Sequence, residues 1–189
     1  MTMPAPVADE RDGLREFLST QQHAYHVVAV NLTDEQARST PSASALSLGG
    51  LIKHLTHVQQ MWTARVHTAP ALTAADQRPV DQQAAEFGSK FVMDEDENLA
   101  DVLAAFADSS ADAIGLVETA DLDTVVPVPP GVPWFPQDGS SWTVRYVFFK
   151  LIEELTRHAG HADIIRESID GATLYELFAA SAQSALKEN

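Results

Sequence analysis

The chain has 189 residues, a length that suits one compact domain, and we expect residues 1–189 to form a single domain. Lys and Arg total 12 against 27 Asp and Glu, and the resulting formal charge of −15 argues against binding to a nucleic-acid backbone or to an anionic membrane surface. The absence of cysteine excludes disulfides, thiolate metal sites and a cysteine nucleophile.

No apolar run approaches the roughly 18 residues of a membrane span, and the first dozen residues lack the apolar stretch of a secretory signal. We therefore expect a soluble, cytoplasmic protein with no nucleic-acid or membrane partner. The oligomeric state stays open, and a homodimer is one alternative.

The apolar residues repeat with the period of a helix. This spacing predicts a first helix over about 8–31, and the capping box of Thr33 and Gln36 predicts a short helical turn after it. Ser47 is suited to cap a second helix, which Pro70 closes.

Two stretches depart from a regular helical pattern: the first turn of the second helix and the segment after that helix. Gly49 and Gly50, in the first turn of the second helix, indicate that another backbone packs closely there. The stretch from 68 to 95 is weakly periodic, and we interpret it as a long connection with a helical turn near 82–87. Long connections of this kind often form the rim of a functional site.

A third helix is predicted to start near Asn98. Residues 94–123 carry ten acidic side chains and no basic ones, which we interpret as a solvated helix face. Half of the ten prolines lie in 127–136, which predicts a stiff loop that holds Trp134 and Phe135 in place.

Ser140 or Ser141 is then expected to cap a fourth helix, and Thr173 with Glu176 forms a capping box for a shorter fifth helix. No strand pattern, repeat or phosphate-binding loop stands out. The predicted fold is all-α: a four-helix bundle with a short additional C-terminal helix, in which the second and fourth helices are adjacent.

The residues suited to chemistry lie on those two helices. At about 100° per residue, Glu154, His158 and His161 fall within roughly 60° of one another on the fourth helix. On the second helix, His54 points along the seam of the bundle, whereas His57 points more toward solvent.

Histidine from one helix with carboxylate and histidine from another is how metal sites are built in bundle cores. These ligand types suit zinc, nickel, iron or manganese about equally. The alternatives are a hydrogen-bonded core histidine at position 54 and a helix-surface pair at 154 and 158. We interpret the remaining histidines as structural or surface residues: His23, His26 and His67.

The segments 47–58 and 154–163 together resemble the DinB/YfiT-like metal-binding four-helix bundle superfamily. The Arg-His-Ala-Gly-His-Ala-Asp run in the second segment is close to the branch of mycothiol transferases found in actinobacteria. The resemblance implies a metal, commonly zinc or nickel, held by His54, Glu154 and His158. Many members have histidine in place of Glu154, and a Glu there resembles the mycothiol-dependent maleylpyruvate isomerase branch. His161 stands where many members have glutamine, so its role as ligand, partner of a ligand or substrate contact is open.

A three-ligand site leaves coordination positions open for catalysis, and a chain without cysteine would need its thiol from outside. The expected function is metal-dependent transfer of a low-molecular-weight thiol, mycothiol by the resemblance, to a small electrophile. Zinc is the first choice of metal, and the catalytic base is whichever of Glu154 and His161 is not a ligand. The alternatives are a metal-dependent hydrolase and a non-enzymatic stress protein that binds a metal or a small molecule.

Three aromatic residues could form the apolar walls of such a site, or else pack in the core: Trp62, Trp134 and Trp142. Arg157 and Arg166 lie one to two turns from the site. They could meet a carboxylate or sugar hydroxyls of the substrate, or could form surface salt bridges.

Overall fold

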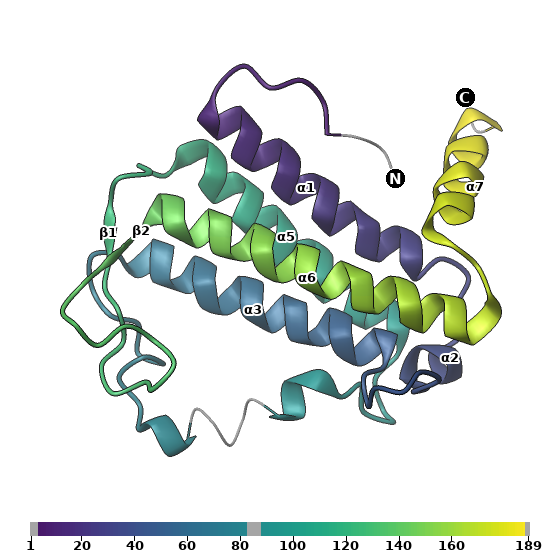
Figure 1. Cartoon of the computed structure of the whole chain (residues 1–189), viewed down its shortest axis with the longest axis horizontal. Helices are drawn as coiled ribbons and strands as arrows, with labels where there is room; N and C mark the ends of the chain where they lie inside the picture. The colour runs from purple at the N-terminus through teal and green to yellow at the C-terminus, as the bar shows by residue number, and fades with distance from the viewer. Residues whose placement is uncertain (1–3, 83–87, 188–189) are drawn as a thin grey trace.

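Four long helices pack side by side in the computed structural model, which describes residues 4–82 and 88–187 (Figure 1). They are α1 (Glu10–Val28), α3 (Leu48–Thr68), α5 (Leu99–Thr119) and α6 (Val144–Asp170). Helix α3 packs against α5 and α6, and α1 packs against the same two helices. The predicted all-α bundle is therefore confirmed, including the adjacency of the helices that carry His54 and His158.

The smaller elements lie at the ends and along one side of the bundle (Figure 1). They are α2 (Asp34–Arg38), the 3-10 helix η1 (Gly88–Phe91), strands β1 (Val125–Val126) and β2 (Trp142–Thr143), and α7 (Leu174–Lys187). The helical turn expected near 82–87 falls largely outside the described residues. No described helix has the length and apolar character that crossing a membrane requires.

Local capping sets the helix starts. The hydroxyl of Ser47 accepts a hydrogen bond from the Gly50 amide at 3.2 Å, as predicted for α3. Both predicted capping boxes form, at the start of α2 and at Thr173 before α7. Helix α1 is shorter than the expected 8–31, because Asp9 is its cap and Asn31 adopts a left-handed conformation (φ 62°) beyond its end.

The expected cap of α6 at Ser140 or Ser141 is wrong. Residues 142 and 143 pair antiparallel with β1, which keeps the chain extended up to Thr143. The helix can start only after this pairing ends, and the hydroxyl of Thr143 accepts from the Tyr146 amide at 3.2 Å. Two residues of strand were too short to produce a period-two pattern in the sequence.

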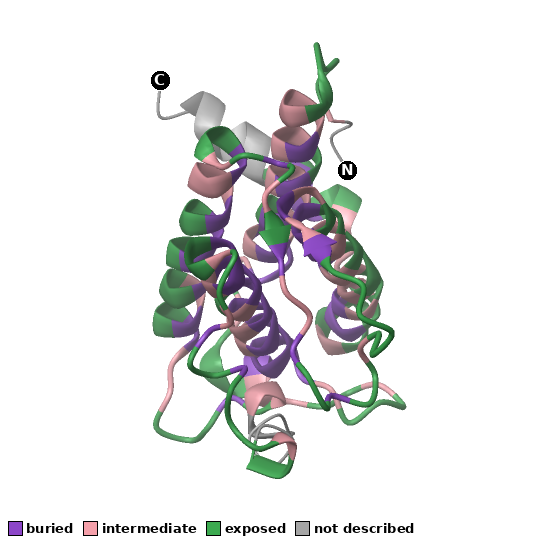
Figure 2. Ribbon diagram, turned by 90° about the vertical axis from the view of Figure 1, so that its left-hand side faces the viewer, coloured by how far each residue is buried: buried purple, intermediate pink, exposed green. Residues whose placement is uncertain are grey.

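Buried residues, purple in Figure 2, lie along all four long helices, and their hydrophobic side chains form one core cluster. The largest fully buried rings belong to Tyr25, Phe106 and Phe148. The hydroxyl of Tyr25 donates to the Leu155 carbonyl at 2.6 Å, so this core ring has its polar atom satisfied. The guanidinium of Arg166 is also buried, and it donates to the carbonyls at the end of α1 and to Asp170.

The directions of the helices follow from contacts between them. The contacts advance along both chains in the same direction, from Lys53 with Glu97, just before α5, at 2.7 Å to Gln59 with Ser109 at 3.0 Å, so α3 and α5 run parallel. Figure 1 shows the consequence: the described parts of the connection, 69–82 and 88–98, lie on the way back from the end of α3 to its start, where α5 begins. For a helix of 21 residues this return covers about 30 Å.

The returning segment packs against the first turns of α3. A Cβ built on Gly50 would lie 2.0 Å from the carbonyl oxygen of Phe91, and one on Gly49 would lie 2.4 Å from the sulfur of Met93. The close approach predicted from these two glycines is confirmed, and the approaching backbone is that of η1 and the residues after it.

Replacing Gly50 with alanine should therefore destabilise the protein, because the new Cβ meets backbone that cannot rotate away. We expect a loss of about 1–3 kcal/mol in the free energy of unfolding, measured by urea denaturation. Gly115→Ala is the matched control, since a Cβ there meets nothing within 4 Å and should stabilise α5 by up to about 1 kcal/mol. Equal effects of the two changes would contradict this account.

Candidate metal centre

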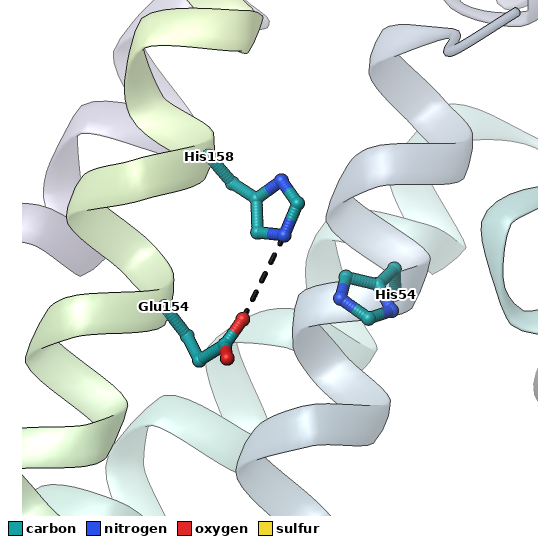
Figure 3. A group of neighbouring side chains, drawn as sticks. All are labelled: His54, Glu154 and His158. Atoms are coloured by element: carbon teal, nitrogen blue, oxygen red, sulfur yellow. Dashed lines mark ion pairs between the residues drawn. The ribbon is translucent and has the colours of Figure 1, made fainter. Parts of the chain in front are cut away.

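Three side chains from two helices meet in the seam between α3 and α6. His54 comes from α3, and Glu154 and His158 come from successive turns of α6 (Figure 3). Each offers one ligand atom such that all three atoms lie within 4.8 Å of one another. The juxtaposition predicted from helical spacing is thus present in the folded chain.

His54 is the most deeply placed of the three, with 2% of its surface exposed. The ring of Phe91 stacks on it, with centroids 3.8 Å apart and an interplanar angle of 15°. Burial, followed by repulsion from His158 and His57, lowers the pKa of His54 to about 4. The imidazole is therefore neutral at physiological pH, as a metal ligand must be.

His158 uses its two ring nitrogens in different directions. Nε2 lies 3.7 Å from Oε2 of Glu154, and Nδ1 lies 3.3 Å from Nδ1 of His161. Burial lowers the pKa of His158, and the nearby Glu154 carboxylate offsets part of this effect. His161 is half-buried beside the three-residue group and is not a member of it.

Glu154 also has two distinct contacts. Nζ of Lys150 lies 2.8 Å from Oε1, whereas Oε2 faces His158. Lys150 contacts Glu153 at 2.8 Å as well, so its charge is shared between two carboxylates. This arrangement leaves Oε2 of Glu154 directed at the imidazoles.

Two neutral imidazoles and one carboxylate form a donor set that fits a divalent metal ion, zinc included. The fit rests on the geometry of the side chains and on the burial that keeps His54 uncharged. With three protein ligands, such a site would keep coordination positions open toward the adjoining pocket.

A pocket of about 460 Å³ extends from these residues along the α3–α6 seam. All three tryptophans line it, as expected for apolar walls. Trp62 and Trp142 are also buried core residues, whereas Trp134 is 66% exposed at the rim.

Several residues around the site had no signal in the sequence. Phe91 reaches His54 only because the connection returns along α3, and Arg65 pairs with Asp76 across a loop. Lys150 could have been found from its spacing of four residues to Glu154. Of the two arginines singled out, Arg157 is exposed, and Arg166 is a buried structural residue instead of a substrate or surface contact.

The remaining histidines lie outside the three-residue group. The exposed His67 contacts Asp112 at 2.9 Å across to α5, and the rings of His23 and His26 pack near Phe178 and Phe106. These contacts agree with their interpretation as structural or surface residues.

Comparisons with known proteins agree with this fold. The crystal structure of a conserved protein from Enterococcus faecalis superposes with a TM-score of 0.57, covering 88% of this chain and 100% of that one, at 16% sequence identity. At that identity the likeness shows the fold alone. No curated protein matches the chain.

The family model of the mycothiol-S-transferases matches residues 13–171. This range runs from the first turns of α1 to the end of α6 and includes His54, Glu154 and His158. The chain therefore belongs to the mycothiol-S-transferase family.

Proposed function

We propose that this protein is a metal-dependent transferase that joins a low-molecular-weight thiol, mycothiol in the first place, to a small electrophile. The observation that carries the proposal is the group of His54, Glu154 and His158 at one end of an aromatic pocket. The family to which the chain belongs supports thiol transfer as the reaction class.

We propose zinc as the metal, held by Nε2 of His158, Oε2 of Glu154 and a ring nitrogen of His54. A divalent ion there would lower the pKa of a bound thiol and so supply a nucleophile near neutral pH. The chain's own side chains then have to orient the ligands and accept the thiol proton. Because the sequence contains no cysteine, the reacting sulfur comes from the substrate.

With Glu154 in the ligand set, His161 is the remaining candidate for the base. Its Nδ1 is 3.3 Å from Nδ1 of His158, so a hydrogen bond between the two rings fixes which nitrogen of His158 faces Glu154. Transfer breaks the S–H bond, with the proton going to a base, and forms a bond between the sulfur and an electrophilic carbon. The electron pair displaced at that carbon departs with a leaving group such as chloride, or moves onto a conjugated carbonyl oxygen. A partly exposed imidazole next to the ligands is suited to take it.

The ligand set can be tested by metal analysis of purified variants. His54→Ala and His158→Ala should be metal-poor but folded, because the bundle core does not depend on the ion. His161→Ala should still bind one metal per chain, with an affinity reduced by about 10–100-fold, as expected for a residue that orients a ligand. Full occupancy in both ligand variants would place the site elsewhere, and a metal-free His161→Ala would make that residue a ligand.

The buried His54 also predicts a pH dependence for the metal-free protein. Its pKa is about 4 in the folded state and about 6.5 unfolded, so below pH ~6.5 the unfolded chain binds a proton that the folded chain does not. Stability should fall as the pH drops from ~6.5 to ~4, by up to about 3 kcal/mol at 1.36 kcal/mol per pKa unit. The measurement is urea unfolding of wild type and His54→Gln across this range, with a chelator present. A constant difference between the two proteins would refute the prediction.

Turnover can be tested directly with metal-loaded protein, mycothiol and monochlorobimane as a generic electrophile. Loss of thiol should be faster with wild type than with His54→Ala, and slowed by about 10²–10⁴-fold in a His161→Ala variant reloaded with metal, the range for removing a general base. Equal rates in wild type and His54→Ala would reject metal-dependent transfer. Hydrolysis of an ester without added thiol would favour the hydrolase alternative instead.

A further inference from the structure

The pocket has two chemically different ends. The metal centre lies at one end, and Arg65 lies eleven residues further along α3, a separation of about 16 Å along the helix. Because α6 runs antiparallel to α3, its first turn and the preceding strand face this second end, where Trp142 lies 5.0 Å from Trp62 between ring centroids. We define the aromatic end by Trp62, Arg65, Phe135, Trp142 and Tyr146.

Arg65 is unusual among the basic residues of the pocket. It is 4% exposed, and its Nε and Nη2 donate to the two carboxylate oxygens of Asp76 at 3.1 and 2.6 Å. Its third nitrogen, Nη1, is buried and has no hydrogen-bond partner among the described residues. A buried donor on a charged group is costly when it stays unsatisfied, so a ligand oxygen that takes up this hydrogen bond, with the neighbouring rings moving aside to admit it, would be favoured.

The surroundings of Arg65 indicate what that ligand resembles. The guanidinium carbon lies 4.7 Å from the centre of the Trp62 ring and 5.6 Å from that of Phe135. A third ring, that of Trp142, is at 6.0 Å. Walls of this kind accept a flat apolar group and supply few polar partners for a polyhydroxylated one.

The charge of Asp76 further restricts the class of ligand that Arg65 can bind. Asp76 already balances the positive charge of Arg65 with a bidentate pair, so Nη1 offers a hydrogen bond without an uncompensated charge. A carboxylate at this point would lie close to the Asp76 carboxylate, whereas a neutral carbonyl oxygen would not be repelled.

We infer that the aromatic end binds the planar, apolar part of the electrophile through a carbonyl oxygen that accepts a hydrogen bond from Nη1 of Arg65. The assignment to the electrophile rests on the proposed thiol transfer. The substrate is then an aromatic or conjugated carbonyl compound. It must be long enough to place its reacting carbon at the metal centre, about 16 Å from Arg65 along α3.

The three tryptophans make the test direct, because the protein has no others and all three line this pocket. Their indole N–H signals in a nitrogen-15 NMR spectrum can be followed while acetophenone, ethylbenzene or benzoate is added. The three probes have nearly the same shape and differ in the oxygen acceptor. Acetophenone should shift the signals of Trp62 and Trp142 saturably and bind about tenfold more tightly than ethylbenzene, with benzoate weaker than acetophenone.

Arg65→Lys keeps a cation for Asp76 but lacks Nη1, so it should bind acetophenone and ethylbenzene equally. If that variant does not fold, Arg65→Met with Asp76→Leu removes the pair as a unit, a replacement that buried ion pairs often tolerate, and should abolish the preference in the same way. His54→Ala should keep the preference, because His54 lies at the other end. The subsite is thus measured separately from metal binding and from turnover.

Three results would overturn the inference. One is equal affinity for acetophenone and ethylbenzene in the wild type. Another is a preference for acetophenone that survives loss of the guanidinium. The third is tighter binding of benzoate, or of methyl glucoside as a probe for the sugar-like body of the thiol, than of acetophenone.

Discussion

The parallel orientation of α3 and α5 is the constraint on which the site depends. Neighbouring parallel helices cannot be joined by a tight turn, so the chain has to run back along the bundle. The return brings Phe91 onto the ring of His54, and the two glycines at the start of α3 let the backbone come close enough. One side of the candidate metal centre is thus formed by the connection between α3 and α5, through η1, and not by one of the four long helices.

The antiparallel orientation of α3 and α6 determines which residues lie at the two ends of the pocket. It places His54 beside the middle of α6, and Trp62 beside the start of α6 and the strand before it. The pocket along this seam therefore has the candidate ligands at one end and aromatic rings at the other. Two ends that differ in this way suit the two substrates of the proposed transfer.

The charges of the three-residue group differ from the strongly acidic character of the whole protein. The protein carries a charge of −15, yet the seam contains neutral imidazoles and a carboxylate that is paired with Lys150. The acidic cluster at 94–97 is itself partly used, since Lys53 contacts Asp94 and Glu97, and Arg38 donates to backbone carbonyls of the same segment. These contacts anchor the returning connection next to the start of α3.

Much of the architecture was predictable because it depends on local chemistry. Apolar stripes with the period of a helix identified the four long helices, and short capping patterns placed the starts of α2, α3 and α7. The start of α6 was misplaced because its cap depends on pairing with β1, between residues 16 and 18 positions apart. Long-range pairing of so few residues leaves no period in the sequence.

The sequence by itself determined the all-α bundle, and the chemical types and helical faces of His54, Glu154 and His158, because residues one turn apart necessarily share a face. Only the tertiary structure decided that His161 is not a member of the three-residue group, that Phe91 covers His54, and that one donor of Arg65 has no hydrogen-bond partner among the described residues. These features depend on how helices are directed and on where a long connection travels. Both are decided by packing between distant segments, which local periodicity does not encode.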